Sequence, residues 1–182
     1  MTEVEKTEKK LSSRKIYDGR ILNLRVDDIE LSNGVRTKRE VVEHKDAAAV
    51  LAVDNYGLLL FVSQYRYAAN AELLEVPAGL VENGENPQDT AVRELQEECG
   101  YKPGHIEKIC SFFCSPGFST EMLHVYYAAD LTESKLPQDK DEIIELVRLS
   151  FAEAEEKIRK GEIIDAKTIA AIYWYGRYKL DN

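Results

Sequence analysis

Short apolar runs divided by polar turns fill most of the chain, a pattern typical of the strands of a sheet. Residues 47–53 and 58–63 are apolar enough to be buried strands, with a turn between them at 54–57. An earlier hairpin over 29–35 turns at Asn33-Gly34, a dipeptide that tight hairpin turns favour. Further strands are predicted at 73–76, 107–113, 122–129 and 143–149. These runs together predict a mixed sheet.

Three segments have the apolar spacing of helices, and a residue type that caps helix N-termini precedes or opens each one. The first covers 87–99, the second begins after Ser150 and ends at Gly161, and the third runs from Asp165 to about Tyr178. Helices on both sides of a mixed sheet make an α/β/α sandwich. We therefore expect an α/β (α+β) fold of this kind, and 182 residues are enough to bury its core.

The first of these helices carries a dense group of charges, because Arg93, Glu94, Glu97 and Glu98 lie within six residues. At about 100° per residue, the three glutamates share an arc of about 100°, and Glu98 lies about 20° from Ala91 on the apolar face. Carboxylates this close repel one another unless a cation lies among them. A hard divalent ion, completed by a phosphate-bearing substrate, meets this need. The alternative is an ordinary solvated acidic helix.

The overall charge limits the class of partner. The formal net charge is −9, from 24 basic and 33 acidic residues, whereas nucleic-acid binding requires a basic surface. An acidic protein does not attract an anionic diphosphate either, so bound divalent metal would have to neutralise the site locally. No apolar run approaches the length of a membrane span. The polar residues 1–10 lack the apolar core of a secretory signal and are expected to form a flexible tail.

The cysteines indicate the compartment. Cys99, Cys110 and Cys114 are an odd number without the spacing of a disulfide scaffold, which favours a reducing cytoplasm. Cys110, Cys114 and His105 could be imagined as zinc ligands, but a second paired cluster is missing from the sequence. Core or loop packing is the better interpretation of these thiols.

The acidic helix and the glycine loop before it match a known motif. Eight positions fit the pattern G-x5-E-x7-R-E-U-x-E-E-x-G-U, where U is a bulky aliphatic residue: Gly79, Glu85, Arg93, Glu94, Leu95, Glu97, Glu98 and Gly100. Only the last position departs, since Tyr101 stands in a slot that packs rather than reacts. The chain therefore resembles the Nudix hydrolases. This resemblance implies a Nudix-type α/β/α sandwich and Mg²⁺- or Mn²⁺-dependent hydrolysis of a nucleoside diphosphate linked to another group.

The resemblance also implies roles for the acidic residues. Glu94 and Glu98 would be the main metal ligands, and Glu97 with the carbonyl of Ala78 would complete a cluster for two or more ions with substrate. Arg93 would orient these carboxylates through charge-assisted hydrogen bonds.

Similar enzymes place the catalytic base on an acidic loop before the last strand. Asp139, Asp141 and Glu142 are the candidates here. We favour Asp141 or Glu142, because they adjoin the strand that would anchor the loop. Glu97 is the alternative base, and a solvated charged loop is the alternative interpretation of the segment.

A second segment, residues 115–121, narrows the substrate. It resembles the S-P-G-x-[ST]-x-E loop of ADP-ribose pyrophosphatases, a Nudix subfamily, although a plain turn is the alternative. Residues 64–67 and 38–42 resemble the same subfamily. The resemblance implies substrate contacts from Gly117 and Glu121, and from Arg66 to the diphosphate or terminal ribose. It also implies an adenosine end built by Tyr17, Arg39 and Glu40, although surface charge or packing could explain each of these residues.

We expect three parts along the chain. Residues 1–10 form the tail, 11–45 form an N-terminal strand and hairpin segment, and 46–182 form the Nudix hydrolase domain. A hairpin has little core of its own. In similar pyrophosphatases such a segment pairs with a second subunit and completes its adenosine pocket, so a homodimer is expected.

The expected function is metal-dependent hydrolysis of ADP-ribose to AMP and ribose 5-phosphate in the cytoplasm, without nucleic-acid or membrane partners. One alternative is a pyrophosphatase for another nucleoside diphosphate sugar, such as GDP-mannose. Another is a non-catalytic ADP-ribose sensor, but such sensors carry an added winged-helix domain and often a damaged motif, whereas this motif is intact. A structural adaptor would have no use for the full set of carboxylates.

Overall fold

The computed structural model describes residues 7–138 and 143–180. The chain divides into two compact units, one of residues 1–46 and 113–122 and one of residues 47–112 and 123–182. The segment 113–122 therefore groups with the first unit, whereas the sequence placed it in the catalytic domain. Within the described ranges, no helix is long and apolar enough to cross a membrane.

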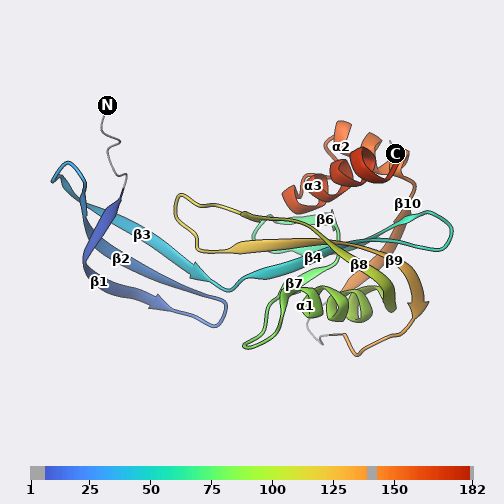
Figure 1. The fold of residues 1–182 in the computed structure, drawn as a ribbon, viewed down its shortest axis with the longest axis horizontal. Helices are drawn as coiled ribbons and strands as arrows, with labels where there is room; N and C mark the ends of the chain where they lie inside the picture. Colours follow the sequence, from blue (N-terminus) through green and yellow to red (C-terminus); the bar gives the residue numbers. More distant parts are fainter. Residues whose placement is uncertain (1–6, 139–142, 181–182) are drawn as a thin grey trace. The chain divides into compact units, whose positions relative to one another are not determined.

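The first unit contains a three-stranded antiparallel sheet in the order β1-β2-β3 (Figure 1). Its strands are β1 (Glu8–Asp18), β2 (Leu22–Leu31) and β3 (Arg36–His44). The predicted turn at Asn33-Gly34 joins β2 to β3, and Gly34 has a φ of +82°, which favours glycine. Strand β1 corrects the sequence prediction, since it begins at Glu8 inside the expected tail. Its mostly polar residues show no alternating pattern that would reveal a strand.

This small sheet buries few of its own side chains. All 11 residues of β1 are exposed, including Leu11, Ile16 and Tyr17. Among the described residues of this unit, Ile29 is the only buried apolar side chain. A sheet of this size is stable only when an apolar face is covered, and these three strands bury few apolar side chains among themselves.

The second unit is built on a mixed sheet in the order β10-β5-β4-β9-β8, with β6 paired to β5 and β7 paired to β4. Its strands are β4 (Ala47–Val53), β5 (Leu59–Arg66), β6 (Ala71–Glu75), β7 (Ala78–Leu80), β8 (Tyr101–Phe113), β9 (Met122–Glu133) and β10 (Ile144–Leu149). Strands β4 and β9 run parallel, from Ala47 opposite Leu123 to Ala52 opposite Ala128. All seven residues of β4 are buried, as its uninterrupted apolar sequence predicts.

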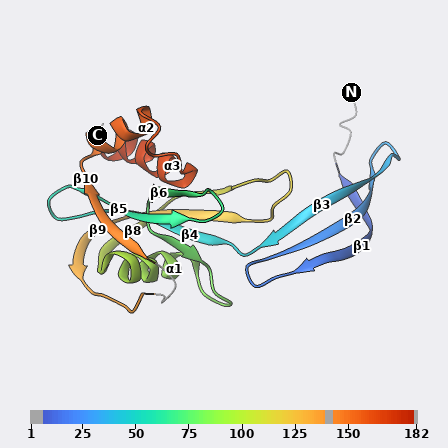
Figure 2. The same ribbon diagram turned by 180° about the vertical axis from the view of Figure 1, so that it is seen from behind.

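Helices cover both faces of this sheet (Figures 1 and 2). They are α1 (Pro87–Glu94) with the π-helical turn η1 (Leu95–Cys99), α2 (Phe151–Arg159), and α3 (Ala166–Tyr175) with the π-helical turn η2 (Gly176–Leu180). On one face, Leu95 shares a buried core with Leu60. On the other face, Ile172 of α3 shares a core with Phe61. The predicted α/β/α sandwich around a mixed sheet is therefore confirmed.

The predicted helix starts are confirmed at all three sites. The side chain of Asn86 accepts a hydrogen bond from the backbone N–H of Gln88 at 2.9 Å. Ser150 and Glu153 form a reciprocal capping box at the start of α2. Asp165 caps α3 by accepting a hydrogen bond from the backbone N–H of Thr168. These caps set the direction in which each helix leaves the sheet.

The second half of the acidic helix differs from the prediction. Apolar spacing predicts one α-helix over 87–99, but the structure is α-helical only as far as Glu94 and continues as η1. A π-helical turn closes i to i+5 hydrogen bonds and so holds one residue more than an α-helical turn. Gly100 ends the helix with a φ of +79°. Turns of this kind are frequent at functional sites, and this one carries Glu97 and Glu98.

We predict that Ile172→Ala lowers the free energy of unfolding by roughly 2–5 kcal/mol, because the removed methyl groups leave a cavity under α3. Ile172 is fully buried, whereas Ile164 is 62% exposed. Ile164→Ala should therefore change the free energy of unfolding by no more than about 0.5 kcal/mol. Denaturant unfolding measures both variants. Equal losses of unfolding free energy in the two variants would show that Ile172 does not pack in a buried core under α3.

Candidate active site

Helix α1 and strand β7 bring the main carboxylates of the motif together. Glu94 lies against Gly79, since a Cβ atom added to Gly79 would stand 1.9 Å from Glu94 Oε1. Glu98 Oε2 accepts a hydrogen bond from the backbone N–H of Ala78 at 3.1 Å. Both glutamates are buried, at 8% and 9% exposure. Two carboxylates therefore reach neighbouring residues of one short strand.

Arg93 is the cation among these carboxylates. Its Nη1 donates to Glu94 Oε1 at 2.6 Å and to Glu97 Oε2 at 3.0 Å. Its Nε and Nη2 donate to the two oxygens of Glu85 at 3.0 and 3.2 Å, and Nη2 also donates to the carbonyl of Leu80 at 3.2 Å. Burial by itself would lower the pKa of Arg93, but these hydrogen bonds and the nearby negative charges outweigh burial and raise it. One guanidinium thus holds three glutamates of the motif.

Glu85 joins the glycine loop to the helix. Its Oε2 accepts a hydrogen bond from the backbone N–H of Glu82 at 3.1 Å, within a turn in which Glu85 N–H donates to the Glu82 carbonyl at 3.0 Å. The hydrogen bond from Arg93 is the main reason that the pKa of Glu85 is lowered to about 2. Glu85 is therefore ionised throughout the neutral range and ties the loop to Arg93.

The oxygen donors of this cluster suit a hard divalent ion. Glu94 and Glu97 face Arg93, and Glu98 faces a backbone N–H, so every carboxylate has a cationic or polar partner. In the part of the chain that the structure describes, no three acidic, histidine or cysteine side chains already converge as a metal cage. Two carboxylates that lie beside adjacent residues of β7 fit a metal ion by their chemistry and their position. Ala78 contributes its N–H to Glu98, and a role for its carbonyl stays a prediction.

A second arginine lies on the neighbouring strands. Arg66 ends β5, and its Nε and Nη2 donate to Glu75 Oε1 and Oε2 at 2.7 and 2.8 Å. These hydrogen bonds are the largest reason that the pKa of Arg66 is raised, and the negative charge of Glu98 adds to the effect. Arg66 therefore lies within electrostatic reach of the metal-ligand candidates.

Two residues of this second cluster were not identified from the sequence. Glu75 is 2% exposed, and Lys167 from α3 forms an ion pair with it. Burial would raise the pKa of Glu75, but its bonds to Arg66 and Lys167 outweigh burial and lower it. The available signal was the isolated charge of Glu75 inside the apolar run 73–76, because a charge in a buried strand requires a partner.

The predicted substrate loop is attached to β3 in the first unit. Val42 N–H donates to the Phe118 carbonyl at 2.7 Å, and Thr120 N–H donates to the Val42 carbonyl at 3.0 Å. The carboxylate of Glu121 lies 3.7 Å from His44 Nδ1. A Cβ added to Gly117 would meet no atom within 4 Å, so this turn leaves its backbone accessible.

The residues predicted for the adenosine end also lie in the first unit. Tyr17 is 58% exposed. Arg39 donates to both oxygens of Glu8, at 3.1 and 2.6 Å. Arg39 and Glu40 are consecutive in β3 and so point to opposite faces of the sheet. The sheet by itself does not gather these side chains on one face, and their shared role stays a prediction.

The candidates for the catalytic base divide into two groups. Asp139, Asp141 and Glu142 lie outside the described residues. Glu97 is described, and its carboxylate is held by Arg93 at 3.0 Å beside the metal-ligand candidates. The assignment of the base therefore stays a prediction for each of them.

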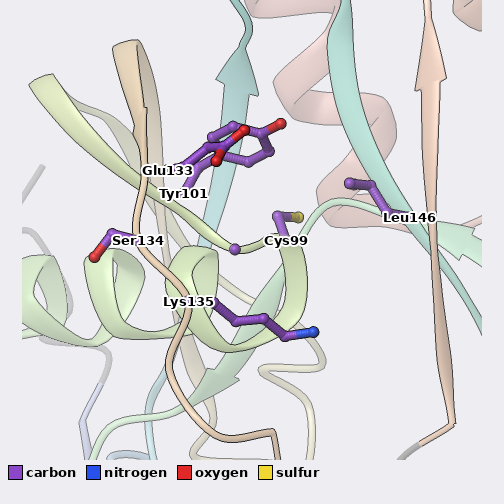
Figure 3. A pocket seen from close by; sticks show the side chains of 7 residues that line it. Cys99, Tyr101, Glu133, Ser134, Lys135 and Leu146 are labelled. Atoms are coloured by element: carbon purple, nitrogen blue, oxygen red, sulfur yellow. The ribbon is translucent and has the colours of Figure 1, made fainter.

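A surface hollow of about 390 Å³ lies beyond the end of η1 (Figure 3). Its lining includes Cys99, Tyr101, Glu133, Lys135 and Leu146. The glutamates of the motif do not line it, and its side chains carry no group of converging carboxylates. This hollow is therefore separate from the acidic cluster beside β7.

Comparisons with known proteins agree with this geometry. The NUDIX domain matches residues 43–172, and the nucleoside diphosphate sugar hydrolase N-terminal domain matches residues 8–42. In fold, the chain is similar to the crystal structure of an ADP compounds hydrolase, with a TM-score of 0.89 and 21% identity over 100% of this chain and 98% of that one.

Curated relatives share more of the sequence. The methanol dehydrogenase activator of Bacillus methanolicus and the ADP-ribose pyrophosphatase of Bacillus subtilis are each 41% identical over 92% of this chain and 91% of their own length. A GDP-mannose pyrophosphatase of Yersinia enterocolitica is 33% identical over 77% of this chain and 78% of its own length. With the intact motif, the family match over most of the chain and these identities, the chain belongs to the Nudix hydrolase family.

Proposed function

We propose that this protein hydrolyses the diphosphate bond of ADP-ribose to AMP and ribose 5-phosphate. The observation that carries the proposal is the buried pair of Glu94 and Glu98, which reach strand β7 from the helix, with Arg93 among the carboxylates. ADP-ribose is favoured because the Bacillus subtilis relative has this activity in its name. The loop 115–121 also resembles that of ADP-ribose pyrophosphatases, and its backbone is hydrogen-bonded to β3.

Glu94 and Glu98 are the residues best placed to hold Mg²⁺ or Mn²⁺, with Glu97 as a further ligand and two or more ions expected with substrate. Bound ions would neutralise the diphosphate oxygens and polarise the phosphorus for attack by water. Arg93 keeps the carboxylates close together until the ions and the substrate arrive. Since the chain carries a net charge of −9, this local neutralisation is what allows an anionic substrate to approach.

The base that takes the proton of the attacking water is proposed to be Asp141 or Glu142, with Glu97 as the alternative. Arg66 is proposed to bind the diphosphate, because its guanidinium is partly exposed and lies within electrostatic reach of Glu98. Gly117 and Glu121 are proposed to contact the substrate, and Tyr17, Arg39 and Glu40 are proposed to form the adenosine end.

The second candidate is a pyrophosphatase for GDP-mannose, which the Yersinia enterocolitica relative favours. A panel of ADP-ribose, GDP-mannose and other nucleoside diphosphate sugars, assayed with Mg²⁺ and with Mn²⁺, distinguishes the two. Hydrolysis of ADP-ribose with the highest kcat/KM supports the proposal. Binding of ADP-ribose without release of AMP would instead indicate a sensor.

The assembly is proposed to be a homodimer in the cytoplasm. The three-stranded sheet of the first unit leaves Leu11, Ile16 and Tyr17 exposed, and a second copy of the chain could cover them. The three cysteines are all free, which agrees with a reducing compartment.

We predict that Glu98→Gln lowers kcat by at least about 10²-fold, because it removes a metal-ligand charge at the centre of the site while keeping its shape. Glu82→Gln is the matched control, since Glu82 is exposed and lies outside the motif. It should stay within about twofold of the unchanged protein. Steady-state kinetics at saturating Mg²⁺ measures both. Near-normal turnover of Glu98→Gln would show that the metal assignment is wrong.

Gly79→Ala should lower kcat by roughly 10²-fold without unfolding the protein, because the new methyl group displaces Glu94 and a shift of about 1 Å is enough for such a loss. Circular dichroism and kinetics separate the two effects. Glu94→Asp shortens the side chain that the new methyl group meets. The variant with both Gly79→Ala and Glu94→Asp should therefore lose less kcat than the two single variants combined. If the losses of kcat in the two single variants simply add in the paired variant, the contact between residue 79 and Glu94 is not their cause.

Light scattering should give a mass of about twice the 20.7 kDa of one chain. Leu11→Lys with Ile16→Lys places charge on β1 and should shift the protein towards monomers, because charge on a strand opposes pairing. Tyr56→Lys is the control, since Tyr56 is 89% exposed in a turn of the second unit. A 20.7 kDa species for the unchanged chain would rule out the dimer.

A further inference from the structure

A network of four charged side chains lies behind the proposed diphosphate-binding arginine. Opposite charges alternate along it, in the order Arg66, Glu75, Lys167 and Asp165. Lys167 bonds Glu75 Oε2 and lies 3.1 Å from Asp165 Oδ1. Its members come from β5, β6 and the first turn of α3, so this network joins two layers of the fold.

Arg66 has more hydrogen-bond donors than this network uses. A guanidinium has five N–H donors, and Glu75 takes two of them through Nε and Nη2. The Glu75 side chain is 2% exposed, whereas the Arg66 side chain is 40% exposed. Arg66 therefore keeps N–H donors that Glu75 does not use, on a side chain that solvent can reach. This geometry suits an arginine that meets a phosphate beside the carboxylate cluster.

Lys167 reduces the extent to which Glu75 cancels the positive charge of Arg66. A carboxylate paired with Arg66 alone would cancel much of the positive charge that a phosphate needs. Here Glu75 shares its negative charge between two cations, because Oε2 accepts hydrogen bonds from both Arg66 Nη2 and Lys167 Nζ. Lys167 also gives Glu75 Oε2 a second donor, so the carboxylate that faces Arg66 is bonded from α3 as well.

The first turn of α3 is itself fixed to the strand beside Glu75. Thr168, which is fully buried, accepts a hydrogen bond from the backbone N–H of Val76 at 2.8 Å. The Thr168 hydroxyl donates to Asp165 Oδ2 at 2.6 Å. Thr168 is thus bonded both to the cap residue Asp165 and to the backbone of Val76, which fixes the position of the adjacent Lys167.

We propose that Lys167 is a positioning residue for Arg66, acting through Glu75 so that the free edge of the guanidinium is held towards the substrate phosphates. This inference rests on the proposed function. Lys167 pairs with Glu75 and Asp165, neither of which belongs to the motif. Its effect should therefore be on substrate binding and should depend on the presence of Arg66.

A double-substitution cycle tests this dependence. The four proteins are the unchanged chain, Lys167→Met, Arg66→Ala and the paired variant. Calorimetry with Mg²⁺ measures binding of a non-hydrolysable methylene analogue of ADP-ribose, and hydrolysis of ADP-ribose is measured with Mg²⁺. Lys167→Met should raise Kd and KM by roughly tenfold and change kcat by less than about threefold. In the Arg66→Ala chain, the same substitution should change Kd by less than about twofold. Lys167→Arg should restore most of the affinity.

Lys157→Met is the matched control. Lys157 also pairs with a glutamate, since its Nζ lies 2.6 Å from Glu162 Oε2, but it lies on α2 and should leave Kd and KM unchanged. Equal losses in the presence and absence of Arg66 would overturn the proposal and indicate a structural role. An unchanged Kd in Lys167→Met would also overturn it.

Stability is measured on each variant. If Lys167→Met is unfolded, the cycle is repeated with Lys167→Gln, which keeps a donor to Glu75 without the charge, and failure of both to fold rejects positioning in favour of a folding role. If the unchanged chain hydrolyses ADP-ribose but the cycle is additive, only the positioning proposal fails. If the unchanged chain neither binds nor hydrolyses ADP-ribose, both proposals fail.

Discussion

The repulsion between clustered carboxylates is the constraint on which the site depends. Glu94, Glu97 and Glu98 occupy one short helical segment, and two of them are buried. Arg93 offsets this repulsion by bonding two of these glutamates and Glu85, and its own burial makes each of these bonds stronger than it would be in water. Removing one member of such a buried set leaves an uncompensated charge. The loop, the helix and the strand are thus held together by charge balance as well as by apolar packing.

Another buried carboxylate, Glu75, is also balanced by cationic side chains. Glu75 receives Arg66 and Lys167, and Ala78 and Gly79 receive Glu98 and Glu94. The short stretch from 75 to 79 therefore meets both charged networks, one reaching it from each helical layer of the sandwich. Its backbone is fixed as well, because Val76 N–H is bonded to Thr168 and the Pro77 carbonyl accepts a hydrogen bond from Val50 N–H. This stretch is where the two faces of the fold are connected.

Local signals in the sequence were sufficient for the features that depend on neighbouring residues. Caps such as Asn86 and Asp165, the hairpin turn at Gly34 and the buried strand β4 all follow from short patterns, and the structure confirms them. The acidic cluster was also identified from the motif, because its glutamates and Arg93 lie close together in the sequence.

Features that depend on distant contacts were not predictable in this way. Strand β1 has an almost wholly polar sequence, and its pairing with β2 gives it order that its own residues do not indicate. The partnership of Glu75 with Lys167 joins positions 92 residues apart, and no spacing rule connects them. The base loop and the adenosine residues remain predictions because they rest on resemblance.

The π-helical turn η1 has a consequence for anyone who would transplant this motif. The motif residues from Arg93 to Cys99 lie on a helix that changes from α to π after Glu94. Because a π-helical turn holds more residues, the rotation from one residue to the next is smaller than in an α-helix. In a straight α-helix with the same sequence, Glu98 would point in a different direction relative to Glu94. A scaffold that reproduces the motif therefore has to reproduce this irregular turn, and a search that assumes ideal helices would pass over suitable hosts.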